Sequence, residues 1–143
     1  MNCDFRFAAE DSTFGVTPAR IGVVYPPAAI KVLLDLVGPA TTKYLLFSGE
    51  LLAATEALSK GLVDRVLPAA DLDTEVATFA STLVSRSQLT IRSAKETVNA
   101  LLSGEDPNPA ALKRYQETIT TGELHEGTKA FTEKRLPVFP WAN

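Results

Sequence analysis

The sequence has very few of the residues that build disulfides, metal centres or nucleic-acid surfaces. It contains one cysteine and one histidine, Cys3 and His125. An internal disulfide is therefore excluded, and two such distant residues do not make a zinc site. The 14 basic residues are scattered and the net charge is -3, which argues against a nucleic-acid surface. We expect Cys3 to be a small buried apolar residue and His125 to be exposed.

Long apolar segments are also lacking. No run approaches the roughly 18 to 20 residues that a membrane helix requires. The N-terminal residues MNCDFRFAAED have neither the basic start nor the apolar core of a signal peptide. A cytoplasmic location is therefore the expectation. The remaining composition, 45% hydrophobic and 22% charged in 143 residues, is typical of a globular chain of about one domain.

The most distinctive chemistry lies in residues 14–27, which read FGVTPARIGVVYPP. Apolar runs and turn residues alternate there, which predicts a strand, a turn, and a short strand or helical turn over Ile21–Val24. Two prolines follow Tyr25 and deny a helix until about Ala28, so the phenol is held on a stiff bend. Such a bend can present Tyr25 to a pocket. The alternative is a tyrosine packed at a helix start with its hydroxyl in water.

Strand signals are few. Alternation over Phe5–Ala9 predicts a strand, and the later candidates are Ile21–Val24, Ser48–Leu51 and Val63–Leu67. These are too few and too short to close a sheet. We therefore infer that the chain is the C-terminal part of a larger α/β fold. The alternative is a complete small protein built on a three-stranded ribbon.

Helical periodicity begins at Ala28 and is expected to stop at Gly38, where Pro39 opens the next helix. A short helix is expected over Leu52–Lys60. After Pro68 the pattern changes to consecutive helices over residues 70–135, which predicts two regions, 1–68 and 69–143.

The predicted helices after Pro68 have clear ends. One ends at Gly104, and Asn108 is expected to cap the next, which ends at Gly122. Gly127 inside the last helix predicts a close helix contact. The apolar faces of these helices exceed what so short a chain can bury, so we expect self-association. Their predicted inward residues include Val76, Phe79, Ile91, Val98, Leu101, Leu112, Tyr115 and Ile119.

Several short motifs occur in one order along nearly the whole chain. They are Cys3–Glu10, Phe14-Gly15, Gly22, Val37–Ala40, Leu46–Gly49, Ala53–Gly61, Gly61–Val66, Glu126-Gly127 and Ala130–Arg135. Together they resemble signatures of the enoyl-CoA hydratase/isomerase (crotonase) superfamily. The resemblance implies an α/β crotonase-like fold, with 1–68 as a C-terminal remnant of its strand-strand-helix spiral core and 69–143 as an all-helical association region. Such a region docks family members into trimers or paired trimers, so the resemblance implies a homo-oligomer.

The same resemblance implies an acyl-CoA thioester substrate and no cofactor beyond the coenzyme A that the substrate carries. Family members stabilise an enolate oxyanion with two backbone N–H donors, which lie upstream of the segment that matches Cys3 and are therefore expected to be absent. Phe131 and Lys134 fall where the family places residues near the CoA adenine and phosphate. The alternative for these two is a solvated helix end with a core phenylalanine.

The branch of the superfamily depends on Pro18 and Tyr25. Hydratases carry a catalytic glutamate at the position that matches Pro18, and proline cannot move a proton. The pattern Thr17-Pro18 followed by Ile21–Tyr25 is similar to methylmalonyl-CoA decarboxylases, where the matching tyrosine orients the leaving carboxylate. The resemblance therefore favours decarboxylation over hydration, with Tyr25 as the catalytic residue. The alternatives are a non-catalytic helical association module and an unrelated small scaffold.

Overall fold

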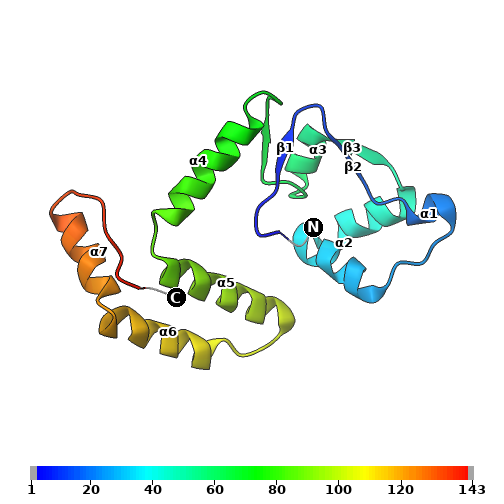
Figure 1. The fold of residues 1–143 in the computed structure, drawn as a ribbon. Helices are drawn as coiled ribbons and strands as arrows, with labels where there is room; N and C mark the ends of the chain where they lie inside the picture. The colour runs from blue at the N-terminus through cyan, green and yellow to red at the C-terminus, as the bar shows by residue number, and fades with distance from the viewer. Residues whose placement is uncertain (1–2, 142–143) are drawn as a thin grey trace. The chain divides into compact units, whose positions relative to one another are not determined.

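The structure, a computed structural model, describes residues 3–141 and divides the chain into two compact units. The first unit ends at Val76 and the second begins at Ala77, so the division falls inside helix α4 (Leu72–Val84). All the described strands lie before α4, and only helices and connecting segments follow it (Figure 1). The roles predicted for residues 1–68 and 69–143 stay predictions.

A parallel strand pair begins the first unit. Strand β1 (Phe7–Ala9) pairs with β4 (Arg65–Leu67). Arg6 fixes the entry to this pair, because its guanidinium lies 3.1 Å from the Asp64 carboxylate and its backbone N–H donates to the same carboxylate at 2.7 Å. Both strands are shorter than predicted, since the Arg6 N–H bonds a side chain instead of a strand carbonyl.

The second strand pair is antiparallel and joins β2 (Thr13–Gly15) to β3 (Leu51–Ala53). Gly15 permits this close approach, because an added Cβ would lie 2.5 Å from Cδ2 of Leu51. The strand predicted over 48–51 begins later than expected, since the preceding helix continues to Ser48.

A short strand or a helical turn was predicted over Ile21–Val24, and of these two alternatives the strand is wrong. Helix α1 (Pro18–Ile21) occupies its start and is closed by Gly22, whose φ of 68° is left-handed. Proline at the first helical position has the φ that a helix needs, which favours the helical turn. Ile21 and Val24 are 72% and 92% exposed, so these apolar residues do not enter the core of the first unit.

Helix α2 (Pro27–Ser48) carries the predicted break at Gly38, whose φ of 73° and ψ of 171° are not helical, and Pro39 resumes the helix. The break explains an unusual buried hydroxyl. A helical threonine ordinarily bonds the carbonyl four residues earlier, and for Thr42 that carbonyl belongs to Gly38. Because the Gly38 backbone leaves the helical direction, the Thr42 hydroxyl is buried without a partner among the described residues.

The core of the first unit forms where α2 meets β3 and helix α3 (Ala54–Ser59). Leu33 and Leu45 of α2 and Leu52 of β3 are almost completely buried. The helix predicted over 52–60 is shorter, because its first residues belong to β3.

The second unit continues from α4 with α5 (Gln88–Ser103), α6 (Asn108–Thr120) and α7 (Glu123–Thr132). Helix α5 packs against α6, and α6 packs against α7 (Figure 1). Ser87 caps α5 by accepting a first-turn backbone N–H at 3.1 Å. Gly104 ends α5 with a φ of 74°, as predicted.

Other helix ends differ from the expectation. Asn108 is the first residue of α6 and not its cap, and its N–H donates to the Asp106 carboxylate at 3.0 Å. Gly122 is the residue that precedes α7 and not the end of α6. The close helix contact predicted at Gly127 is not found among the described residues, because the nearest atom to an added Cβ is in the Phe139 ring of the C-terminal segment, at an ordinary van der Waals distance of 3.6 Å.

The predicted inward faces of the later helices are only partly confirmed. Phe79 and Ile91 are half-buried, but the described structure leaves several of their apolar partners exposed: Val76, Val98, Leu101, Leu112, Tyr115 and Ile119. Helical periodicity places these residues on common faces, but it does not show whether another surface covers them. The predicted self-association stays a prediction.

The C-terminal end of α7 predicts a stabilising substitution. Lys134 has a φ of 53°, and this left-handed conformation costs a side-chain-bearing residue about 1 to 2 kcal/mol. We expect Lys134→Gly to raise the free energy of unfolding by about 0.5 to 1 kcal/mol. The urea midpoints of the two proteins measure it. A lower midpoint for Lys134→Gly than for Lys134→Ala would contradict the strained turn.

Candidate functional site

Tyr25 lies between Gly22 and the start of α2. Its ring is half-buried and packs against the core of the first unit. Pro26 is extended, with φ -65° and ψ 145°, and Pro27 is the first residue of α2. The predicted stiff bend is therefore present. The Tyr25 hydroxyl has no hydrogen-bond partner among residues 3–141, so it is available to a ligand.

Pro18 is buried at the first position of α1. No side chain caps this helix, because the hydroxyl of Thr17 makes no capping hydrogen bond. The position that the resemblance assigns to a hydratase glutamate is thus occupied by a buried ring that has no proton to exchange. The structure brings Pro18 and Tyr25 into the same unit, on the two sides of the left-handed Gly22.

An apolar pocket of about 430 Å³ lies in the first unit beside β1 and β2. Phe14, Gly15 and Val16 line it, so the stretch that leads to Pro18 contributes directly. Tyr25 does not line this pocket. Cys3 is at its edge and is exposed, which corrects the expectation of a buried cysteine. Cys3 lies in a bend before β1.

Phe131 and Lys134 lie together at the end of α7 in the second unit. Phe131 is 86% exposed, which excludes a core phenylalanine in the described chain. The Lys134 N–H donates to the Phe131 carbonyl at 3.3 Å, and the left-handed Lys134 turns the chain back along the helix. An exposed aromatic ring and an ammonium group on one turn suit a flat, negatively charged ligand.

The turn is secured by a carboxylate that the sequence did not single out. Both Glu126 oxygens accept from Arg135, at 2.7 and 2.9 Å, and one also accepts the Val138 backbone N–H at 2.7 Å. Hydrogen bonding from Arg135, aided by the Val138 N–H, lowers the pKa of Glu126 to about 2. Arg135 also bonds Glu133, so it is more than the solvated surface charge that sequence patterns indicate.

Acid should unfold the second unit partly through Glu126. Its folded pKa of about 2 lies below the ordinary value of 4.5, so the pair stabilises fully above pH 4.5 and this contribution is lost as the pH falls to 2. We expect the urea midpoint of the wild type to fall over this range more steeply than that of Glu126→Gln. Trp141 fluorescence reports the transition. Equal slopes for the two proteins would contradict the assignment.

A second glutamate of α7 is buried. Glu123 is 3% exposed, accepts from the Ser87 hydroxyl, and accepts the Trp141 backbone N–H at 2.8 Å. Glu123 lines a pocket of about 440 Å³ that Phe131 and Phe139 also line. The sequence shows only that Glu123 follows a glycine at the start of a helix. This pattern does not reveal that the carboxylate is buried.

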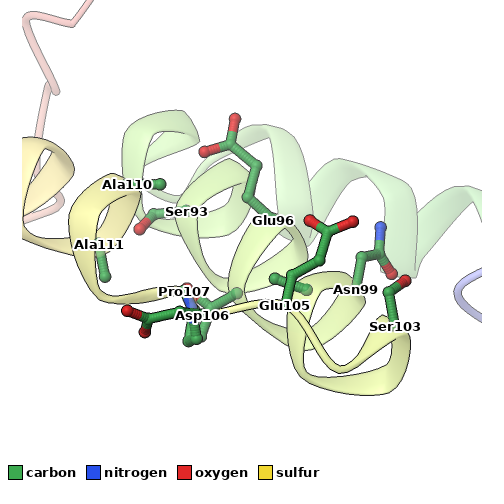
Figure 2. A pocket seen from close by; sticks show the side chains of 11 residues that line it. Ser93, Glu96, Asn99, Ser103, Glu105, Asp106, Pro107, Ala110 and Ala111 are labelled. Carbon is green, nitrogen blue, oxygen red and sulfur yellow. The ribbon is translucent and has the colours of Figure 1, made fainter.

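An acidic pocket of about 480 Å³ lies between α5 and α6. Figure 2 shows the carboxylates of Glu96 and Glu105 beside this pocket, with Asp106 pointing elsewhere. The charge of Glu96 is already paired, because Arg114 donates to both of its oxygens at 3.0 and 2.7 Å. This hydrogen bonding lowers the pKa of Glu96. Asp106 accepts two hydrogen bonds from Asn108. These contacts support a structural role for the pocket.

Other side chains have ordinary surroundings. His125 is exposed, as predicted, and Glu10 and Asp11 lie in a turn. Glu50 accepts the Tyr44 hydroxyl and thereby raises the pKa of that tyrosine. The described residues contain no group of three or more metal-ligating side chains. Within the same residues, no helix is both long and apolar enough to cross a membrane.

Comparison with known proteins gives a consistent result. The family profile described as enoyl-CoA hydratase/isomerase matches residues 1–141. A protein of Dictyostelium discoideum named probable enoyl-CoA hydratase, mitochondrial, is 34% identical over 145 residues, covering 100% of this chain and 52% of the relative. The crotonyl-CoA hydratase of Syntrophomonas wolfei is 31% identical, with 97% and 54% covered. The chain therefore spans about half the length of these relatives.

Solved structures agree with the sequence comparison. A crystal structure of an enoyl-CoA hydratase/isomerase family member superposes with a TM-score of 0.91 at 32% identity, covering 99% of this chain and 54% of that one. Enoyl-CoA hydratase from Bacillus anthracis gives 0.87 at 30% identity, with 96% and 54% covered. The crotonase-like α/β fold is confirmed. The coverage of the homologues does not uphold the finer prediction that the matched half is the C-terminal one, so the fold is assigned without that placement.

Proposed function

Because the chain belongs to the enoyl-CoA hydratase/isomerase family, we propose that the protein acts on acyl-CoA thioesters by chemistry that passes through an enolate. The family match over residues 1–141 is the observation that carries this proposal. Coenzyme A enters as part of the substrate, and no separate cofactor is proposed. We also propose a homo-oligomer of family type and a cytoplasmic location, whereas the Dictyostelium discoideum relative is named as mitochondrial.

The reaction class follows from Pro18. Hydration of an alkene needs a group that moves a proton to or from water. Pro18 has no such group and is buried at the start of α1. Decarboxylation requires no base at the reacting carbon, only a stabilised enolate oxygen and a carboxylate held out of conjugation. Pro18 therefore supports removal of a carboxylate over addition of water.

Tyr25 supplies the polar contact in this proposal. Its ring is packed and its hydroxyl is unbonded within the described chain, so it can donate one hydrogen bond to the departing carboxylate without first breaking another. The bond from the α-carbon to the carboxylate breaks, its electron pair forms the enolate, and carbon dioxide leaves. A solvent proton then completes the acyl-CoA product. Hydration remains the competing candidate, because the relatives are named as hydratases.

Binding tests the thioester proposal before any turnover. We expect calorimetry to detect binding of an acyl-CoA such as propionyl-CoA. Binding of free propionate should appear only at far higher concentration, because the carboxylic acid lacks the nucleotide and pantetheine parts. Equal affinity for the two compounds, or no binding of the thioester, would contradict the proposal. Asp73→Asn, a substitution at an exposed residue, should bind propionyl-CoA like the wild type and serves as the control variant.

A further inference from the structure

The C-terminal segment Leu136–Trp141, called the C-terminal strap below, is tied to α7 at two points. Glu126 accepts the Val138 N–H at 2.7 Å, and Glu123 accepts the Trp141 N–H at 2.8 Å. The Phe139 ring of the strap lies near the Gly127 backbone, since a Cβ added at Gly127 would be 3.6 Å from it, an ordinary van der Waals distance. Two carboxylates on one helix therefore hold successive parts of the strap.

The turn that precedes the strap is held by its own hydrogen bonds. Arg135 N–H donates to the Ala130 carbonyl at 3.1 Å, and Lys134 N–H donates to the Phe131 carbonyl at 3.3 Å. These bonds close the turn, but the turn costs energy because Lys134 is left-handed. The two parallel hydrogen bonds from Arg135 to Glu126 hold Arg135, the residue after Lys134, against α7. Such paired bonds fix geometry as well as adding energy.

This arrangement fixes the direction in which the Lys134 side chain leaves the backbone. Its side chain is exposed, and the structure shows no ion pair or hydrogen bond that would hold its ammonium group. The direction of its Cα–Cβ bond is therefore set by the backbone turn alone. Phe131, one helical turn earlier, is exposed in the same way. Because Phe131 lies within α7, loosening the turn adds to ligand binding the cost of ordering Lys134 relative to Phe131.

We propose that Glu126 is a positioning residue, which holds Phe131 and Lys134 in the arrangement that receives the nucleotide end of coenzyme A. The inference rests on the proposed acyl-CoA function, since it assumes that Phe131 and Lys134 contact the ligand. Glu126 itself does not touch the ligand. It acts through Arg135 and through the strap, and Glu123 secures the far end of that strap.

The experiment measures the affinity of the protein for coenzyme A and for pantetheine, which lacks the nucleotide. We expect Glu126→Gln to weaken coenzyme A binding by about three- to tenfold, the range for ordering one or two more side chains on binding, and to leave pantetheine binding unchanged. Glu133→Gln is the matched control, because it removes the same charge at a residue that also contacts Arg135 but that forms no hydrogen bond with the described residues of the strap. It should change coenzyme A binding less than about twofold.

A second readout does not depend on the ligand. Trp141 is the single tryptophan of the chain and lies in the strap, with the Arg92 guanidinium 5.4 Å from its ring centre. Glu126→Gln should increase quenching of its fluorescence by iodide, and Glu133→Gln should not. Arg135→Lys, which keeps the charge but loses the paired bonds, should fall between the wild type and Glu126→Gln in both measurements.

The outcomes separate the two proposals. If the wild type does not bind coenzyme A, the proposed function fails and the inference fails with it. If Lys134→Ala weakens coenzyme A binding and Glu126→Gln does not, only the positioning role is overturned. Equal losses for coenzyme A and pantetheine in Glu126→Gln also overturn it, because they would indicate general unfolding. Should Glu126→Gln fail to fold, Arg135→Lys decides by the same criteria.

Discussion

Replacement of Tyr25 by phenylalanine in the full-length polypeptide is expected to slow decarboxylation of a malonyl-type CoA ester by about ten- to a hundredfold. The ring and its packing against the core are kept, and only the hydroxyl is removed. A hydrogen bond to a charged group contributes roughly 1.5 to 3 kcal/mol, and its loss in the transition state gives a rate effect of about this size. Because the hydroxyl acts by holding the carboxylate out of the plane of the thioester carbonyl, the orientation from which carbon dioxide can leave, we expect kcat to fall more than KM rises.

Tyr44→Phe is the matched control for Tyr25→Phe. Tyr44 is exposed and its hydroxyl is already committed to Glu50, so removing that hydroxyl should leave the rate unchanged. Steady-state rates of the two variants, measured side by side with the wild type, give the comparison. If Tyr25→Phe is as fast as Tyr44→Phe, the Tyr25 hydroxyl has no part in the reaction and the residue has only a packing role.

The largest expected loss of stability is that of Leu45→Ala. Leu45 is fully buried in α2 and belongs to the core cluster of the first unit. Deleting a buried leucine side chain costs about 2 to 5 kcal/mol through lost burial and the cavity that remains, which is a large part of a typical total of about 5 to 15 kcal/mol.

The control for Leu45→Ala is Phe47→Ala on the same helix. Phe47 is 74% exposed, so its removal should change the free energy of unfolding by less than about 0.5 kcal/mol. Urea unfolding followed by far-UV circular dichroism measures both variants. Equal losses for Leu45→Ala and Phe47→Ala would show that the exposed face of α2 is buried in solution, as in an oligomer.

Local signals predicted much of the helical structure. Gly38 and Pro39 mark the break in α2 because glycine reaches a left-handed φ and proline resumes a helix, and both effects act within a few residues. Gly104 ends α5 for the same reason. The family motifs also depend on sequence order alone, which is why family membership could be expected before the fold was seen.

Long-range contacts could not be predicted in this way. The apolar residues Ile21–Val24 have the composition of a strand, but no described strand pairs with them and α1 includes Ile21. The burial of Glu123 depends on the Ser87 hydroxyl and the Trp141 N–H, which come from distant parts of the sequence. The hydrogen bond between Glu126 and the C-terminal strap could not be predicted, because carboxylates on a helix usually face solvent.

Product analysis with two substrates tests the central claim most directly. The purified full-length polypeptide is incubated separately with methylmalonyl-CoA and with crotonyl-CoA, and the products are identified by mass spectrometry against an enzyme-free control. The account predicts carbon dioxide release and propionyl-CoA from the first substrate, with no hydrated product from the second. Hydration of crotonyl-CoA above the control, with methylmalonyl-CoA left intact, would contradict it.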